Sequence, residues 1–242
     1  MAEPPPLPRP TETYDPNCTR CPRLASFLAA TRRRYGDYWA RPVPSFGAAR
    51  PRIVIVGLAP GLHGANRTGR PFTGDHAGLL LYRTLHEAGL ASAPESRSAR
   101  DGLRLRDARI VNAVKCVPPA NKPLPAEVRC CNDYLTHELR SLRGVRVYLA
   151  LGHVAHGALL LALGIRRSRH RFGHGHEHRL EGGRWLIDSY HCSRYNTSTG
   201  RLTPTMFRAV VARACLRAGL PAWASRASPQ SRSSSDEQTA SE

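Results

Sequence analysis

The sequence has little lysine, few acidic side chains and no long apolar run. Only Lys115 and Lys122 are lysines among 36 basic residues, and 18 acidic residues leave a net charge of +18. No apolar run reaches the roughly 20 residues of a membrane-spanning helix, and the proline-rich N-terminus lacks the apolar core of a secretory signal. These absences argue against a membrane protein, and we expect an intracellular, cytoplasmic one.

The excess of positive charge favours a polyanionic partner. Nucleic acid is the first candidate and an acidic membrane surface the second. The preference for arginine over lysine can also reflect a GC-rich genome, so it is not evidence for phosphate recognition. The seven cysteines are an odd number, which in a reducing compartment favours metal ligands or free thiols over a disulfide framework.

Short apolar runs alternate with helical patterns along the chain. The predicted strands are 53–56, 108–114, 145–151 and 184–190, and predicted helices begin after Cys21 and near Ala77, Pro125, His153 and Pro204. This alternation predicts a three-layer α/β/α domain over residues 14–220, with a central, mostly parallel four-stranded sheet. Residues 1–13 and 221–242 are rich in proline, serine and other polar residues, which predicts disordered segments.

A long glycine-rich segment, residues 57–75, follows the first predicted strand. Gly64 and Gly69 have the spacing of a phosphate-binding loop, but Arg70-Pro71 stand where that loop needs lysine and serine or threonine. A dinucleotide-binding fingerprint is also absent. We therefore interpret the segment as a rigid pocket wall that carries His63, Asn66, Phe72 and Asp75.

Polar residues follow three of the predicted strands. Asp75, Asn121 and His191 come after the first, second and fourth strand, and the carboxyl ends of parallel strands open on one edge of the sheet. We expect the three to converge there. Each also has a structural interpretation: Asp75 as a helix N-cap, Asn121 as a turn residue and His191 as a buried structural histidine, while Phe72 fits a core position.

Cysteines at two distant places could close one metal site. Cys18 and Cys21 form a C-x-x-C pair, Cys116 ends the second strand, and Cys130 and Cys131 lie early in the next helix. Four thiolates suit either zinc or an iron–sulfur cluster. The second half is spread over a loop and a helix turn, unlike a zinc ribbon, and this favours a cluster at one edge of the domain.

The segment between the third and fourth predicted strands is rich in histidine and glycine. It contains His170, His174, His176 and His178. Such loops sometimes bind zinc. The interleaved glycines favour a flexible hairpin connection over a dedicated metal site.

Residues 57–75, together with residues 191–203, resemble the two motifs of the family 5 uracil-DNA glycosylases. With the cysteine pattern and strand order, the resemblance covers roughly residues 14–220. It implies a DNA-repair enzyme that hydrolyses the N-glycosidic bond of uracil, and of other deaminated bases such as hypoxanthine, leaving an abasic site. We also expect a monomer, because nothing in the sequence suggests a coiled coil or an apolar interface, and we expect it to be associated with the bacterial nucleoid. The implied cofactor is a [4Fe–4S] cluster on Cys18, Cys21, Cys116 and Cys131.

The resemblance also implies roles for single residues. Asp75 would orient water and stabilise the cationic sugar, His191 would donate to the departing base, and Asn121 would bind the base edge. The implied substrate pocket comprises Leu58, Ala59, Pro60, Gly61, His63, Phe72 and Asn121. The implied DNA contacts are Arg67, Arg70, Arg194, Tyr195, Asn196, Thr197 and Arg201. Ala59 replaces a polar residue of the wider superfamily, which implies that catalysis depends on other side chains.

Two other functions fit the same residues. One is a non-catalytic nucleic-acid-binding protein with a structural zinc. The other is an α/β hydrolase that uses Asp75 and His191 on a small nucleoside or amide. We see no lysine placed to form a Schiff base, so we predict no strand cleavage.

Overall fold

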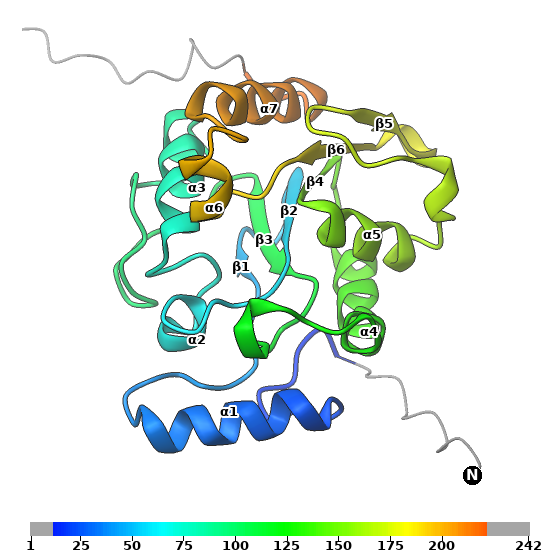
Figure 1. Ribbon diagram of the computed structural model, residues 1–242. Helices are drawn as coiled ribbons and strands as arrows, with labels where there is room; N and C mark the ends of the chain where they lie inside the picture. The colour runs from blue at the N-terminus through cyan, green and yellow to red at the C-terminus, as the bar shows by residue number, and fades with distance from the viewer. Residues whose placement is uncertain (1–11, 222–242) are drawn as a thin grey trace, which may run out of the picture.

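A mixed six-stranded sheet forms the centre of the computed structural model, which describes residues 12–221 (Figure 1). The strands, in sequence order, are β1 (Phe46–Gly47), β2 (Ile53–Gly57), β3 (Ala108–Asn112), β4 (Val147–Leu151), β5 (Glu177–Arg179) and β6 (Trp185–Ser189). Their spatial order is β1-β3-β2-β4-β6-β5. The inner four are mutually parallel, and β1 and β5 pair antiparallel at the two edges. The expected four-stranded sheet is therefore corrected to six strands, because two short edge strands extend the four predicted ones.

Helices cover both faces of this sheet, as predicted. The α-helices are α1 (Pro22–Arg34), α2 (Ala65–Thr68), α3 (His76–Glu87), α4 (Pro125–Ser141), α5 (His153–Ala162), α6 (Arg194–Ser198) and α7 (Pro204–Arg217). Three short 3₁₀ turns, η1 (Pro119–Asn121), η2 (Arg167–Arg169) and η3 (Glu181–Gly183), complete the described elements. Figure 1 shows α3 and α7 on one side of the sheet and α4 and α5 on the other.

The alternation of side chains along each strand builds two cores. In β2, Ile53 and Ile55 belong to the cluster that includes α3 and α7. Val54 and Val56 belong to the cluster that includes α4 and α5. All four side chains are buried, as expected for an inner parallel strand covered by helices on both faces.

Helix α1 packs outside these two layers, beside the start of α4. Its Leu24 and Leu28 share a third buried cluster with Cys116 and Cys131. Ion pairs also join this part of the chain to α4: Arg20, just before α1, lies 2.7 Å from Asp133, and Arg23 of α1 lies 2.7 Å from Glu127. The N-terminal segment is thus fastened to the domain at the cysteines.

The segments predicted to be disordered lie almost wholly outside the described residues. Within residues 12–221, none of the helices is long and apolar enough to cross a bilayer.

The chain order around β2 creates the place for a ligand site. From β2 the chain moves to β3 on one side, and it later returns to β4 on the other side of β2. In open α/β sheets, such a reversal leaves a crevice at the carboxyl ends of the strands. The loops after β2, β3 and β6 all leave the sheet at this edge.

Candidate active site

A pocket of about 250 Å³ lies where these loops meet. Its lining residues are Leu58, Ala59, Pro60, Gly61, Ala65, Phe72, Asp75, His76, Ala77, Asn121, His191, Ser193 and Arg194. The structure thus brings together Asp75, Asn121 and His191 from the loops after three different strands. A carboxylate, an amide and an imidazole share one concave surface beside a phenyl ring.

Asp75 is both a helix cap and a pocket residue. Its Oδ1 accepts a hydrogen bond from the backbone N–H of Gly78 at 3.0 Å, which caps α3. Its other oxygen lies against the backbone of Gly64, where an added Cβ would come within 2.5 Å of Oδ2. Glycine is therefore needed at position 64 to make room for the carboxylate. Burial raises the pKa of Asp75, against the hydrogen bonds from the Gly78 and Ala77 N–H groups.

His191 lies two residues after the end of β6 and is held through its backbone. The side chain of Asn196 donates to the carbonyl of His191 at 2.8 Å, so the first turn of α6 fixes the histidine. Among the described residues, its ring nitrogens have no hydrogen-bond partner. Burial lowers the pKa of His191 to about 4, so the imidazole is neutral near pH 7.

Phe72 forms the apolar wall beside His191. Its backbone has φ +54°, and its side chain is 6% exposed. A Cβ at Gly57 would lie 2.7 Å from the phenyl ring, so the glycine that ends β2 lets the ring pack against the strand. The ring thus covers the end of β2 on one side and borders the pocket on the other.

Asn121 closes the η1 turn with φ +55° and is exposed at the pocket. The turn interpretation and the pocket interpretation of this residue therefore both describe its position. Its side-chain amide has no hydrogen-bond partner among the described residues and is open to a ligand.

Two predicted ligand contacts lie elsewhere. His63, predicted in the pocket wall, is not among the lining residues, and its Nδ1 is 2.9 Å from the hydroxyl of Tyr38. Arg70, predicted to contact DNA, is 6% exposed and forms an ion pair with Asp101 at 2.6 Å.

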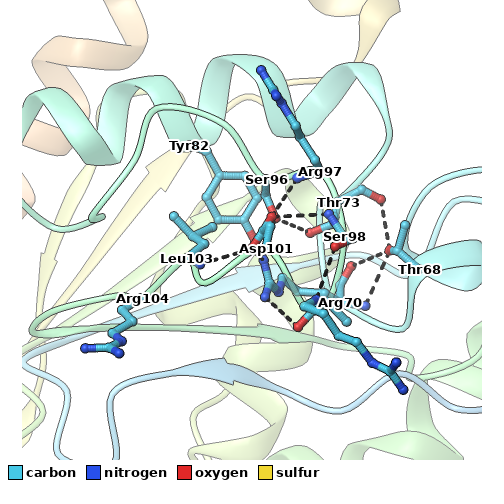
Figure 2. A network of polar contacts seen from close by, with 12 residues as sticks. Thr68, Arg70, Thr73, Tyr82, Ser96, Arg97, Ser98, Asp101, Leu103 and Arg104 are labelled. Carbon is cyan, nitrogen blue, oxygen red and sulfur yellow. Dashed lines mark hydrogen bonds and ion pairs between the residues drawn. The ribbon is translucent and has the colours of Figure 1, made fainter.

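Figure 2 shows why Arg70 does not fit a phosphate contact: its guanidinium points into a polar network formed with the 96–101 segment. It donates to Ser96 at 3.0 Å and to the carbonyl of Ala99 at 2.9 Å, in addition to Asp101. Although burial works against it, the hydrogen bonds from Arg70 and from backbone N–H groups lower the pKa of Asp101 to about 2. Arg70 therefore anchors a loop.

The other predicted DNA contacts divide into two groups. Arg67, Arg194, Tyr195 and Arg201 are exposed, with Tyr195 at 70%. The side chains of Asn196 and Thr197 make internal hydrogen bonds, and so does exposed Arg67, which donates to the carbonyl of His63 at 2.9 Å.

Sequence reasoning missed His76, Ser193, Ala65 and Ala77 in the pocket lining. His76 Nε2 is 2.9 Å from Thr197 Oγ1, which ties the start of α3 to α6 across the pocket. Ser193 caps α6 by accepting from the N–H of Asn196. A serine just before a short helix is a recognisable N-cap signal, whereas nothing local to His76 indicates its partner.

The predicted thiols gather in a second, small cavity between α1 and α4. Cys18, Cys21, Cys116, Cys130 and Cys131 all line it. Burial, followed by the neighbouring thiols, raises the pKa of Cys21 and of Cys116, and burial raises that of Cys131 to about 11. Ionising several thiols here therefore requires positive charge among them.

Cys130 and Cys131 differ in their hydrogen bonds. Cys131 Sγ accepts the backbone N–H of Lys115 at 3.3 Å, as a thiolate ligand does. Cys130 Sγ instead donates to the carbonyl of Arg20 at 3.8 Å.

Comparisons with known proteins identify the family of this chain. A family model described as the uracil DNA glycosylase superfamily matches residues 44–215. A type-5 uracil-DNA glycosylase of Thermus thermophilus is 52% identical over 208 residues, covering 84% of this chain and 94% of that protein. Type-5 enzymes of Mycobacterium tuberculosis and Pyrobaculum aerophilum are 46% and 44% identical, each over 84% of this chain and over 79% and 90% of their own lengths. The chain therefore belongs to the uracil DNA glycosylase superfamily, in its type-5 family.

Proposed function

We propose that this protein is a monofunctional DNA-repair glycosylase that hydrolyses the bond between deoxyribose and uracil, leaving an abasic site. The observation that carries the proposal is the meeting of Asp75, Asn121, His191 and Phe72 in one pocket at the carboxyl edge of the sheet. The relatives named as type-5 uracil-DNA glycosylases support it over most of the chain.

Asp75 acts on the sugar side of the reaction. Breaking the N-glycosidic bond gives the sugar oxocarbenium character, which a nearby carboxylate stabilises while it orients a water for attack. The capping hydrogen bond from Gly78 holds one oxygen of Asp75 in place. The other oxygen is free of the cap and serves the reaction.

His191 acts on the leaving base. Uracil departs as an anion, and a neutral imidazole donates an N–H to its developing oxyanion without placing a cation in the pocket. The lowered pKa of His191 supports this neutral form. The hydrogen bond from the Asn196 side chain to the His191 carbonyl holds the backbone of His191 in place, and with it the position of the ring in the pocket.

Phe72 and Asn121 recognise the extrahelical base. A flipped base stacks on aromatic or apolar side chains and is read by hydrogen bonds on its edge. The side-chain amide of Asn121 offers an NH₂ donor and a carbonyl acceptor to such an edge. Because Ala59 adds no polar group to the wall, we extend the substrate class to other deaminated bases, including hypoxanthine.

The two lysines support base removal without strand cleavage. Lys115 is buried and ion-paired with Glu138 at 3.0 Å, and neither it nor Lys122 lines the pocket. An amine nucleophile for a Schiff base is therefore absent from the pocket lining within the described residues.

The protein engages DNA through exposed groups around the pocket mouth. Arg67, Arg194 and Arg201 bind phosphates, which position the duplex without reading its sequence. Tyr195 fills the gap left by the flipped base. We propose that the protein acts as a monomer on DNA in the cytoplasm, associated with the nucleoid of a bacterium.

The thiol cavity fits a [4Fe–4S] cluster held by Cys18, Cys21, Cys116 and Cys131. All four thiols line one cavity between α1 and α4, and four thiolates are the donor set that such a cluster takes. The cluster, when bound, would brace α1 against α4.

An assay on defined oligonucleotides tests this function. The iron-loaded protein is incubated with strands carrying one uracil, one hypoxanthine or only normal bases, then treated with alkali. We expect scission at uracil and at hypoxanthine only, and none before the alkali. Absence of scission would leave the nucleic-acid-binding alternative. Turnover of free deoxyuridine, insensitive to salt, would instead favour the small-molecule hydrolase.

A further inference from the structure

A second cluster of ligand-type side chains lies away from the pocket and the thiols. It joins His156 of α5, His178 of β5 and Asp188 of β6. The side chains of His156 and Asp188 are 3% and 0% exposed, and that of His178 is 13% exposed. The proposed glycosylase chemistry uses none of these groups.

The hydrogen bonds of His156 require a positive centre in this cluster. Its Nε2 lies 3.0 Å from the carbonyl oxygen of His170, which can only accept, so Nε2 carries a hydrogen. Its Nδ1 lies 2.7 Å from Asp188 Oδ1, another acceptor. A neutral imidazole has only one N–H, so either a second proton or a metal ion must sit between Nδ1 and the carboxylate.

His178 brings a second imidazole to the same carboxylate. Its Nε2 lies 3.2 Å from Asp188 Oδ2. A neutral His178 can donate its own Nε2–H to this oxygen, whereas a metal ion would use all three donor atoms. Zinc bonds of about 2.1 Å at tetrahedral angles put ligand atoms about 3.4 Å apart. That spacing is close to the 3.2 Å of the His178 contact and about 0.7 Å wider than the 2.7 Å of the His156 contact, so Nδ1 and Oδ1 would move apart when a metal ion binds.

Backbone groups hold these side chains as outer-sphere partners hold metal ligands. The His170 carbonyl fixes the tautomer that leaves Nδ1 of His156 as a ligand, and the N–H of Gly173 lies 3.3 Å from Asp188 Oδ2. Both partners come from the histidine-rich segment 170–178. The three side chains therefore fasten this segment to the sheet.

We propose that His156, His178 and Asp188 bind one divalent transition-metal ion, of which zinc is the best match to two imidazoles and a carboxylate. The ion locks residues 170–178 onto β6. The same segment reaches the end of that strand, where His174 Nδ1 accepts the backbone N–H of Tyr190 at 3.1 Å, next to His191. The site is independent of the proposed glycosylase activity and of the thiols.

Metal content of matched variants tests this site. The full chain and its His178→Ala, Asp188→Asn and His176→Ala variants are treated with EDTA, given zinc chloride, desalted and analysed for zinc and iron. His176 is the control, because it is exposed in the same segment and outside the cluster. All four proteins keep the same cysteines, so zinc bound to thiols cancels in the comparison.

We expect the parent and His176→Ala to hold one zinc per chain more than His178→Ala and Asp188→Asn, with equal iron in all four. Equal zinc in all four would overturn the proposal, and the contact between His156 Nδ1 and Asp188 would then hold a proton and no metal ion.

Thermal unfolding of the parent protein gives a second readout. Zinc at a hundredfold excess over its Kd should raise the Tm of the EDTA-treated parent by roughly 5–10 °C. The same addition should leave the Tm of His178→Ala unchanged. An unchanged parent Tm would contradict the site even if a variant failed to fold.

Discussion

The ring centroids of Phe72 and His191 lie 5.8 Å apart, and the planes of the two rings are tilted by 31° relative to each other. Phe72 belongs to the long loop after β2, and His191 to the loop after β6, on either side of β4 in the sheet. The contact therefore joins the two sequence motifs across the pocket. An apolar stacking surface and a neutral donor are presented side by side to one planar ligand.

Replacing Asp75 by asparagine should remove activity without loss of stability. Burial raises the folded-state pKa of Asp75 above its unfolded value, so its contribution to stability is present at low pH and is lost as pH rises through the folded-state pKa. A neutral asparagine, which still caps α3, avoids this loss at pH 7. We expect the rate of base release to fall about 100- to 10,000-fold, with an equal or higher Tm.

Exposed Asp37 provides the matched control, since Asp37→Asn should leave both the rate and the Tm unchanged. Full activity in Asp75→Asn would remove Asp75 from the chemistry.

His191 should set the low-pH limits of both activity and stability. Its folded-state pKa of about 4 lies below the ordinary value of 6.5. Between pH 4 and pH 6.5, the unfolded chain therefore binds a proton at this histidine that the folded chain does not bind. Stability therefore falls as pH drops from about 6.5 to 4, and His191→Gln should flatten that part of the curve. We also expect His191→Gln to lower the single-turnover rate about 100- to 1,000-fold.

The measurements are Tm and single-turnover rate against pH, with the exposed His86→Gln as control. A step in the parent rate profile near pH 6.5 that disappears in His191→Gln would mean that the catalytic imidazole is charged.

Two arginines of the motifs should behave in opposite ways. Arg70→Met breaks a buried ion pair and leaves Asp101 without its cationic partner, so the free energy of unfolding should drop by about 3–5 kcal/mol. Arg194→Met removes an exposed charge at the pocket, so stability should hold while the slope of log K for DNA against log salt decreases by about 1. Denaturant unfolding and salt-dependent binding check both, and the reverse pattern would contradict the assignments.

Two adjacent cysteines give a sharp test of the proposed cluster ligands. Cys131→Ser should lose iron and the visible absorption of the protein, because Cys131 carries the N–H···S bond of a thiolate ligand. Cys130→Ser should retain both, since its thiol donates to a carbonyl. Iron analysis of the two purified variants distinguishes them, and iron loss in Cys130→Ser alone would exchange their roles.

The sheet could be predicted only where strands are long enough to show a pattern. Ile53 to Val56 is an apolar β-branched run bounded by a glycine, so β2 can be predicted from the sequence. Strands β1 and β5 have two and three residues and form by pairing with β3 and β6. No local periodicity exists over such a length, which is why the predicted sheet lacked its edges.

The site residues could be predicted from the sequence where the sheet topology alone sets their position. Asp75, Asn121 and His191 follow parallel strands, whose ends must meet at one edge. Arg70 was misplaced because its partner Asp101 lies 31 residues away in a polar loop. Asp188 gave no signal because a single acid within an apolar strand does not reveal the histidines that surround it.

The structure of the Asp75→Asn variant bound to an oligonucleotide containing uracil tests the central claim most directly. We predict that the uracil leaves the helix and stacks on Phe72, with its edge within hydrogen-bonding distance of Asn121 and an oxygen facing His191. A uracil bound in another cavity, or left stacked in the duplex beside an empty pocket, would contradict the account.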